Sequence, residues 1–168
     1  MNRETQLRLI ERIKSTLADI PAAPGFVTRR ERTAKLKSLL LCIGEAEGFD
    51  VCPHSNEPQW LFDFIWYQVT GDTHQLRNIV LAVEMEWDPK PGSIRYDFEK
   101  LLVSKAPLKL MIYEDCRRGV LDELKRSLLT YTQPTDAELY ILAEFIAGPP
   151  QERGFRFHVL NSKAEAVS

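Results

Sequence analysis

The chain has only three cysteines among its 168 residues, and it has no long apolar run. Cys42, Cys52 and Cys116 are odd in number and widely scattered, which argues against a disulfide framework and against a zinc site built from cysteine pairs. No apolar stretch approaches the roughly 20 residues that span a bilayer. The N-terminus also lacks the apolar segment of a secretory signal. We therefore expect a cytoplasmic protein that does not bind membranes.

Internal repeats, low-complexity tracts and interdomain linkers are also missing. With 44% apolar and 27% charged residues, the composition is ordinary for a globular protein, and a chain of this length can bury a sizeable core. We expect one domain over residues 1–168. Its expected parts are an N-terminal helix (1–20), a central core (29–113), a helix with two further strands (114–160) and a disordered tail (161–168).

The charge is close to balanced overall but unevenly placed. Residues 1–40 carry nine Lys or Arg against four Asp or Glu, whereas the remainder carries thirteen against twenty. A basic segment beside an acidic one fits a partner with a phosphate backbone that approaches a metal-binding carboxylate cluster. A pair of solvated helical faces is the simpler explanation, so charge alone supports a nucleic-acid partner only weakly.

Residues 79–87 form the most informative segment, because only Glu84 and Glu86 interrupt its apolar run. Residues two apart in a strand share a face, so both carboxylates should point the same way as Val80 and Ala82. Two neighbouring buried acids repel each other and lose hydration unless a cation joins them. A divalent metal ion is the cation that we expect there.

A third acid lies in an upstream strand predicted over residues 60–67, where Asp63 is the only charged residue. The turn-forming residues 70–73 would let the two strands pair antiparallel, which brings Asp63 near Glu84 and Glu86. Three carboxylates in this arrangement suit a hard cation, Mg²⁺ or Mn²⁺.

Glu47 ends a predicted helix that Thr28 would cap, with Glu31 completing a capping box. At about 100° per residue, Glu47 falls inside the apolar stripe near Leu36, whereas Glu45 falls on the opposite side. If one helix acid faces the strand acids, Glu47 is therefore the better candidate. The alternative is that Glu47 points into solvent from the last turn.

The remaining pattern alternates helices and strands. A strand, a helix and another strand in close succession predict a parallel crossover. The expected fold is an α/β sandwich of three layers around a mixed central sheet. Helices are predicted over 3–19, 28–48, 94–104 and 118–129, and strands over 51–54, 60–67, 79–87, 108–113, 138–146 and 155–160.

The order of these elements over residues 29–113 resembles the PD-(D/E)XK nuclease superfamily, which has the restriction-endonuclease-like fold. In this resemblance Asp63 stands for the first metal-binding Asp and Glu84 for the acid of the second half-motif. Glu86 occupies the position that usually holds Lys. Glu47 would match the helix acid of some branches.

The sequence departs from the family pattern in two places. Phe62 replaces the Pro before the Asp, and Glu86 replaces the Lys. Some restriction enzymes with Glu at the second position are active, whereas other relatives without the Lys are inactive binding modules. Lys100 or Lys105 on the following helix would restore a cation near the site, and their helical angles do not decide between the two.

The resemblance implies a metal-dependent endonuclease that hydrolyses phosphodiester bonds in DNA. Asp63, Glu84 and the Met85 carbonyl would hold Mg²⁺ or Mn²⁺. Glu86 would bind a second metal or orient the attacking water as a general base. A homodimer, with the N-terminal helix as a candidate interface, would cut both strands. The alternative function is a catalytically inactive module of the same fold that binds nucleic acid or protein.

Two simpler interpretations compete with parts of this hypothesis. The strand acids would be structural if they were edge-exposed carboxylates paired with Arg or Lys, for instance with Arg77 or Arg95. The three tryptophans, Trp60, Trp66 and Trp87, are interpreted as core and strand-edge packing rather than as platforms on which bases stack.

Overall fold

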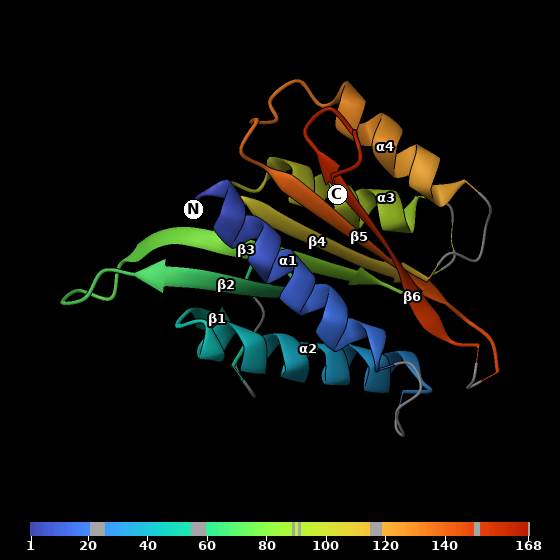
Figure 1. Cartoon of the computed structure of the whole chain (residues 1–168), viewed down its shortest axis with the longest axis horizontal. Helices are drawn as coiled ribbons and strands as arrows, with labels where there is room; N and C mark the ends of the chain where they lie inside the picture. The colour runs from blue at the N-terminus through green and yellow to red at the C-terminus, as the bar shows by residue number, and fades with distance from the viewer. Residues whose placement is uncertain are drawn as a thin grey trace.

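A computed structural model describes residues 1–20, 26–54, 60–88, 90, 92–114, 119–149 and 152–167. Within these residues the chain forms four helices and one six-stranded sheet (Figure 1). The helices are α1 (Arg3–Ala18), α2 (Arg29–Ala46), α3 (Ser93–Val103) and α4 (Val120–Thr130). The strands are β1 (Asp50–Cys52), β2 (Phe64–Val69), β3 (Leu76–Glu86), β4 (Leu108–Glu114), β5 (Leu139–Ile146) and β6 (Gly154–Asn161).

The sheet is mixed and follows the order of the chain, from β1 at one edge to β6 at the other. Strands β1, β2 and β3 pair antiparallel, β3, β4 and β5 pair parallel, and β6 pairs antiparallel with β5. Helices α3 and α4 connect the parallel strands, as the predicted crossover requires. The carboxyl ends of β3, β4 and β5 therefore meet at one end of the sheet.

Helices cover both faces of the sheet and make three layers (Figure 1). Leu81 of β3 and Leu110 of β4 pack with buried residues of α1 and α2, whereas Ala82 and Met111, one residue further on, pack with α3 and α4. The predicted α/β sandwich around a mixed sheet is confirmed at this level. None of the helices in the described part of the chain combines the length and the apolar character needed to cross a bilayer.

Helix α2 begins where the sequence predicts. The Glu31 amide donates to Thr28 Oγ1 at 3.2 Å, and the Thr28 amide donates back to Glu31 Oε2 at 2.8 Å. This capping box satisfies two amides that the first helical turn leaves without partners. The hydrogen bonds to Thr28 hold the pKa of Glu31 below its usual value.

The strand alternation differs from the prediction at one place in β3. The β2–β3 register shifts between Trp66, which is opposite Leu81, and Tyr67, which is opposite Ile79. Val80 is therefore the extra residue of a β-bulge, which reverses the alternation beyond it. The prediction that Val80 shares a face with the two acids was wrong, because Val80 packs with the α1 and α2 core.

Two further boundaries differ from the prediction. Strand β2 begins at Phe64 rather than at residue 60, so Asp63 lies just before the strand. The chain after β6 is not a loose tail in the described residues, because it folds back on the sheet. The Val167 amide donates to Val159 O at 2.9 Å, and Leu160 forms a β-bridge with Ala166.

Candidate functional site

A buried carboxylate, Glu84, lies near the carboxyl end of β3 and faces α3. Its side chain is only 1% exposed, and its Oε2 lies 2.7 Å from Lys100 Nζ. The same Lys100 Nζ lies 3.0 Å from Asp97 Oδ1, because residues three apart on a helix share one side. Of the two lysines left open by the sequence, the structure brings Lys100 to the strand acids. Lys105 follows α3, is exposed, and has no ion pair among the described residues.

Asp63 joins Glu84 from the neighbouring strand. Because the antiparallel register pairs Phe64 with Val83, the residue before β2 comes beside Glu84. Asp63 Oδ2 accepts a hydrogen bond of 2.8 Å from the Met85 amide. The structure thus brings together Asp63, Glu84 and the main chain of Met85, which the sequence predicts as neighbours.

Glu86 lies two residues further along β3 and has different partners. Its Oε1 accepts a hydrogen bond of 2.6 Å from the Asp88 amide, and its carboxyl group also hydrogen-bonds to that of Asp97. Two carboxyl groups can share a hydrogen bond only when one of them carries a proton. Burial raises the pKa of Glu86, and Asp97 raises it further.

We call Asp63, Glu84, Glu86, Asp97 and Lys100 the acid site. Burial raises the pKa of Glu84 to about 8, with a smaller contribution from its negative neighbours. Burial alone would lower the pKa of Lys100, but its hydrogen bonds to Glu84 and Asp97 raise it to about 12. At neutral pH Lys100 is therefore charged and Glu84 neutral.

One oxygen of Glu84 has no hydrogen-bond partner. Glu84 Oε1 is buried, and no group in the described residues donates to it. A buried carboxylate oxygen without a partner is costly and calls for a cation or a donor. Together with the oxygens of Asp63 and the Met85 carbonyl, it belongs to the class of ligand that Mg²⁺ and Mn²⁺ prefer.

The predicted three-carboxylate centre does not form as such. No group of three or more His, Cys, Asp or Glu side chains in the described ranges is arranged to hold a metal ion. Glu86 turns towards Asp97 and the Asp88 amide instead of joining Asp63 and Glu84. The oxygens that suit a cation are therefore two carboxylates and one main-chain carbonyl.

Glu47 lies outside the acid site. It caps the end of α2, where it pairs with Arg8 at 2.6 Å and also with Arg12, both on α1. The hydrogen bond from Arg8 lowers the pKa of Glu47. Because α1 and α2 cover the sheet face opposite α3, the prediction that Glu47 faces the strand acids was wrong. The position of Glu47 in the apolar stripe of α2 indicated correctly that its side chain is buried. It could not reveal that its partners are arginines of another helix.

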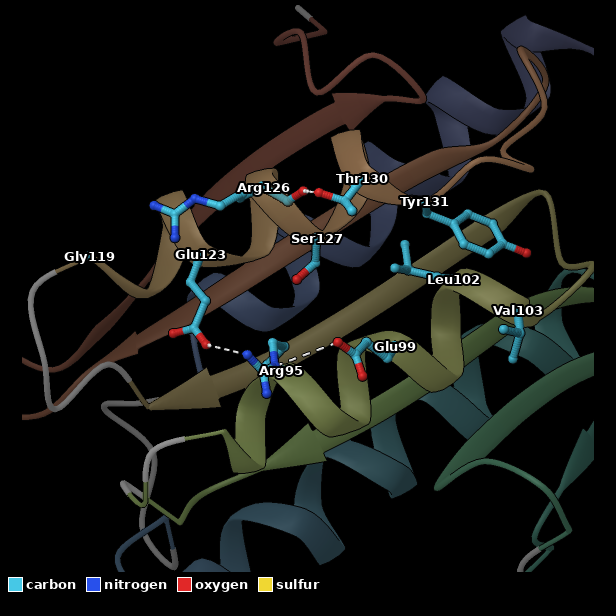
Figure 2. Close-up of a pocket in the computed structure, with 10 residues that line it drawn as sticks. All are labelled: Arg95, Glu99, Leu102, Val103, Gly119, Glu123, Arg126, Ser127, Thr130 and Tyr131. Carbon is cyan, nitrogen blue, oxygen red and sulfur yellow. Dashed lines mark hydrogen bonds and ion pairs between the residues drawn. The ribbon is translucent and has the colours of Figure 1, made fainter.

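The alternative that the strand acids pair with Arg or Lys is supported for Glu84, whose partner is Lys100, but finds no support at Arg95. Arg95 Nε lies 3.5 Å from Glu99 Oε1, and its Nη1 lies 3.9 Å from Glu123 Oε1. Figure 2 shows these contacts in a hollow of about 620 Å³ between α3 and α4. At about 100° per residue, this flank of α3 is opposite the one that carries Asp97 and Lys100. The hollow is therefore separate from the acid site.

The sequence interpretation missed Asp97 and a second buried ion pair. Lys109 is fully buried in β4, with its Nζ 2.8 Å from Glu138 Oε2, and the Tyr140 hydroxyl donates to the same oxygen at 2.6 Å. The one available signal was Lys109 itself, a charged residue inside the apolar run 108–113. Asp97 was recognisable only as a residue three positions before Lys100.

Comparisons with known proteins add no evidence on function to the geometry of the acid site. The sequence matches no protein-family model, and no curated protein matches it either.

Proposed function

We propose that the protein is a Mg²⁺- or Mn²⁺-dependent nuclease that hydrolyses phosphodiester bonds in DNA. The observation that carries the proposal is the buried Glu84 carboxyl group, which lies beside Asp63 and the Lys100 ammonium and has one oxygen without a partner among the described residues. The chain order from α2 through β1, β2, β3 and α3 to β4 supports a restriction-endonuclease-like fold. It also supports the assignment of Asp63 and Glu84 as the family's paired acids.

Asp63, Glu84 and the Met85 carbonyl would hold the metal ion. When bound, such an ion supplies Lewis-acid polarisation of the phosphate and lowers the pKa of a bound water. The Met85 amide orients Asp63 through its hydrogen bond of 2.8 Å.

Lys100 would supply the positive charge that Glu86 cannot. It reaches the site from α3 rather than from β3, and the carboxyl groups of Glu84 and Asp97 hold its ammonium. A lysine ammonium in this position can donate to a phosphate oxygen and compensate its charge. The hydrogen-bonded pair of Glu86 and Asp97, in which the pKa of Glu86 is raised, suits a group that accepts a proton from the attacking water.

A second candidate function is a catalytically inactive module of the same fold. It is favoured by the bridge that Lys100 makes between Glu84 and Asp97, because this bridge fills the carboxylates' need for a cation. In such a protein the lysine would replace the metal permanently. Divalent ions would then leave its stability unchanged.

Thermal melts with and without Mn²⁺, followed by a plasmid-cleavage assay, separate the two functions. We expect Mn²⁺ to raise the Tm of the wild type but not that of Glu84→Gln. Cleavage should fall by about 100-fold or more in Glu84→Gln and Lys100→Met. Lys105→Met is the matched control and should cleave as the wild type does. Absence of both metal stabilisation and cleavage in the wild type would leave the inactive module as the better description.

A further inference from the structure

A pocket of about 340 Å³ lies where β1, β2 and the β2–β3 hairpin meet. Three aromatic rings line it, those of Trp60, Tyr67 and His74, and Val69 and Leu76 add apolar walls. We call it the edge pocket, because β1 is the edge strand of the sheet (Figure 1).

The edge pocket opens on the same sheet face as the acid site. Cys52 and Tyr67, which line it, pack against the core shared with α3, the helix that reaches Glu84 through Lys100. Tyr67 is four residues from Asp63 along the chain, roughly 13 Å at the rise of a strand.

Trp60 comes still closer to the acid site along the chain. It precedes Asp63 by three residues and so lies within about 11 Å of it. A distance of about 13 Å spans only a few nucleotides of a polynucleotide strand. One polynucleotide could therefore reach the acid site and the edge pocket together.

Trp60 differs from the other two tryptophans in its exposure. Trp66 and Trp87 are buried, but Trp60 is 50% exposed at the rim of the edge pocket. Leu76, another lining residue, is 47% exposed. An exposed indole beside a second aromatic ring is a surface on which a flat ring can stack. The pocket also has room for such a ring.

We propose that the edge pocket holds a nucleobase of an unpaired nucleotide close to the phosphodiester at the acid site. This inference rests on the proposed nuclease function and narrows its substrate to single-stranded or locally unpaired DNA. In an intact duplex both faces of a base are stacked on neighbouring bases, so the base cannot enter a pocket unless it leaves the stack.

Binding of a single-stranded oligothymidine of roughly 12 nucleotides, compared with a duplex of the same length, tests the proposal. Trp60→Ala should weaken single-strand binding about tenfold, as expected for one lost stacking contact, and leave duplex binding unchanged. Trp60→Phe should retain most of the affinity. Leu61→Ala is the matched control, because Leu61 is 66% exposed but does not line the pocket.

Several results would overturn the proposal. One is that Trp60→Ala and Leu61→Ala reduce single-strand affinity equally. A second is that Trp60→Ala weakens duplex binding as much as single-strand binding. A third is that the free protein forms a dimer that depends on Trp60. If cleavage of single strands requires Glu84 but is unchanged in Trp60→Ala, the base pocket alone would be overturned. Trp60-dependent binding without metal-dependent cleavage would overturn the nuclease proposal and support the pocket. Failure to bind either form of DNA would overturn both.

Discussion

In the described part of the chain, two lysines pair with buried glutamates on the α3 side of the sheet, and the two pairs differ in how completely they are satisfied. Lys100 and Glu84 lie 2.7 Å apart near the carboxyl end of β3. Lys109 and Glu138 lie 2.8 Å apart where β4 and β5 begin. Similar distances conceal different surroundings.

The Lys109–Glu138 pair is embedded in further hydrogen bonds. Lys109 Nζ also donates to Leu102 O at 3.4 Å and to the Tyr140 hydroxyl at 3.3 Å, and Tyr140 donates to Glu138. A satisfied network of this kind fixes the positions of the elements it joins. We therefore regard it as structural, although burial lowers the pKa of Lys109.

The Lys100–Glu84 pair leaves part of its charge unbalanced. Glu84 keeps one oxygen without a partner in the described ranges, and burial, with a smaller effect of the neighbouring acids, raises its pKa to about 8. Perturbed ionisation of this type is enriched at functional sites. The comparison teaches that the candidate site is marked by an incomplete set of partners and not by burial alone.

The largest expected effect comes from breaking the satisfied pair. Lys109→Met should lower the free energy of unfolding by about 3–5 kcal/mol at neutral pH, because it leaves Glu138 buried without its cation. Lys100→Met should lower the free energy of unfolding much less, since Glu84 is already neutral at neutral pH. Urea unfolding of both variants measures the difference. Equal losses would contradict the distinction between the two pairs.

The next effect depends on pH. The folded-state pKa of Glu84, about 8, lies above its ordinary value of 4.5. The folded protein therefore holds this proton more tightly than the unfolded chain, and the stability it contributes is lost as the pH rises from 4.5 through about 8. Without metal, Glu84→Gln should be more stable than the wild type above pH 8 by at least about 2 kcal/mol.

The control for this prediction is the other glutamate. Glu138→Gln should destabilise the protein both above pH 8 and near pH 5.5 by about 1–3 kcal/mol, because it weakens a satisfied buried pair at either pH. Urea unfolding in the presence of a chelator at the two pH values gives both comparisons. A Glu84→Gln variant less stable than the wild type above pH 8 would contradict the raised pKa.

Metal binding should also depend on the proton of the Glu84 carboxyl group. A divalent ion at Glu84 must displace its proton, so the rise in Tm caused by Mn²⁺ should be larger above pH 8 than near pH 6. We expect a difference of a few degrees, measured by thermal melts in matched buffers. The shift should vanish in Asp63→Asn and persist in Lys109→Met. A shift independent of pH would place the ion elsewhere.

The smallest effect is expected at a third pair, on the opposite face of the sheet. Glu47→Gln removes the partner of Arg8 and Arg12, which are largely solvated. It should cost about 0.5–1 kcal/mol of unfolding free energy and leave DNA cleavage unchanged. Cleavage reduced as strongly as in Glu84→Gln would restore Glu47 to the acid site.

The local features of the chain were predictable from its sequence, because they depend on residues close together in it. Thr28 and Glu31 form the predicted capping box, and alternation over the end of β3 puts Ala82 and Glu84 on one face. The hairpin brings Asp63 beside Glu84, as the turn residues 70–73 indicate. A one-residue bulge at Val80 escaped prediction, because nothing in the composition of β3 marks it.

The ionisation and the partners of the acids were decided by tertiary structure alone. Whether Lys100 or Lys105 reaches Glu84 depends on where α3 lies over the sheet, and whether Glu47 meets the acid site or α1 depends on helix packing. The pKa of Glu84 is set mainly by lost hydration, which exists only once the layers have closed. The sequence by itself determined which residues can ionise and which face of a strand the acids near the end of β3 occupy. Only the folded chain decided which of those charges are left without a complete set of partners, because such partners come from distant segments.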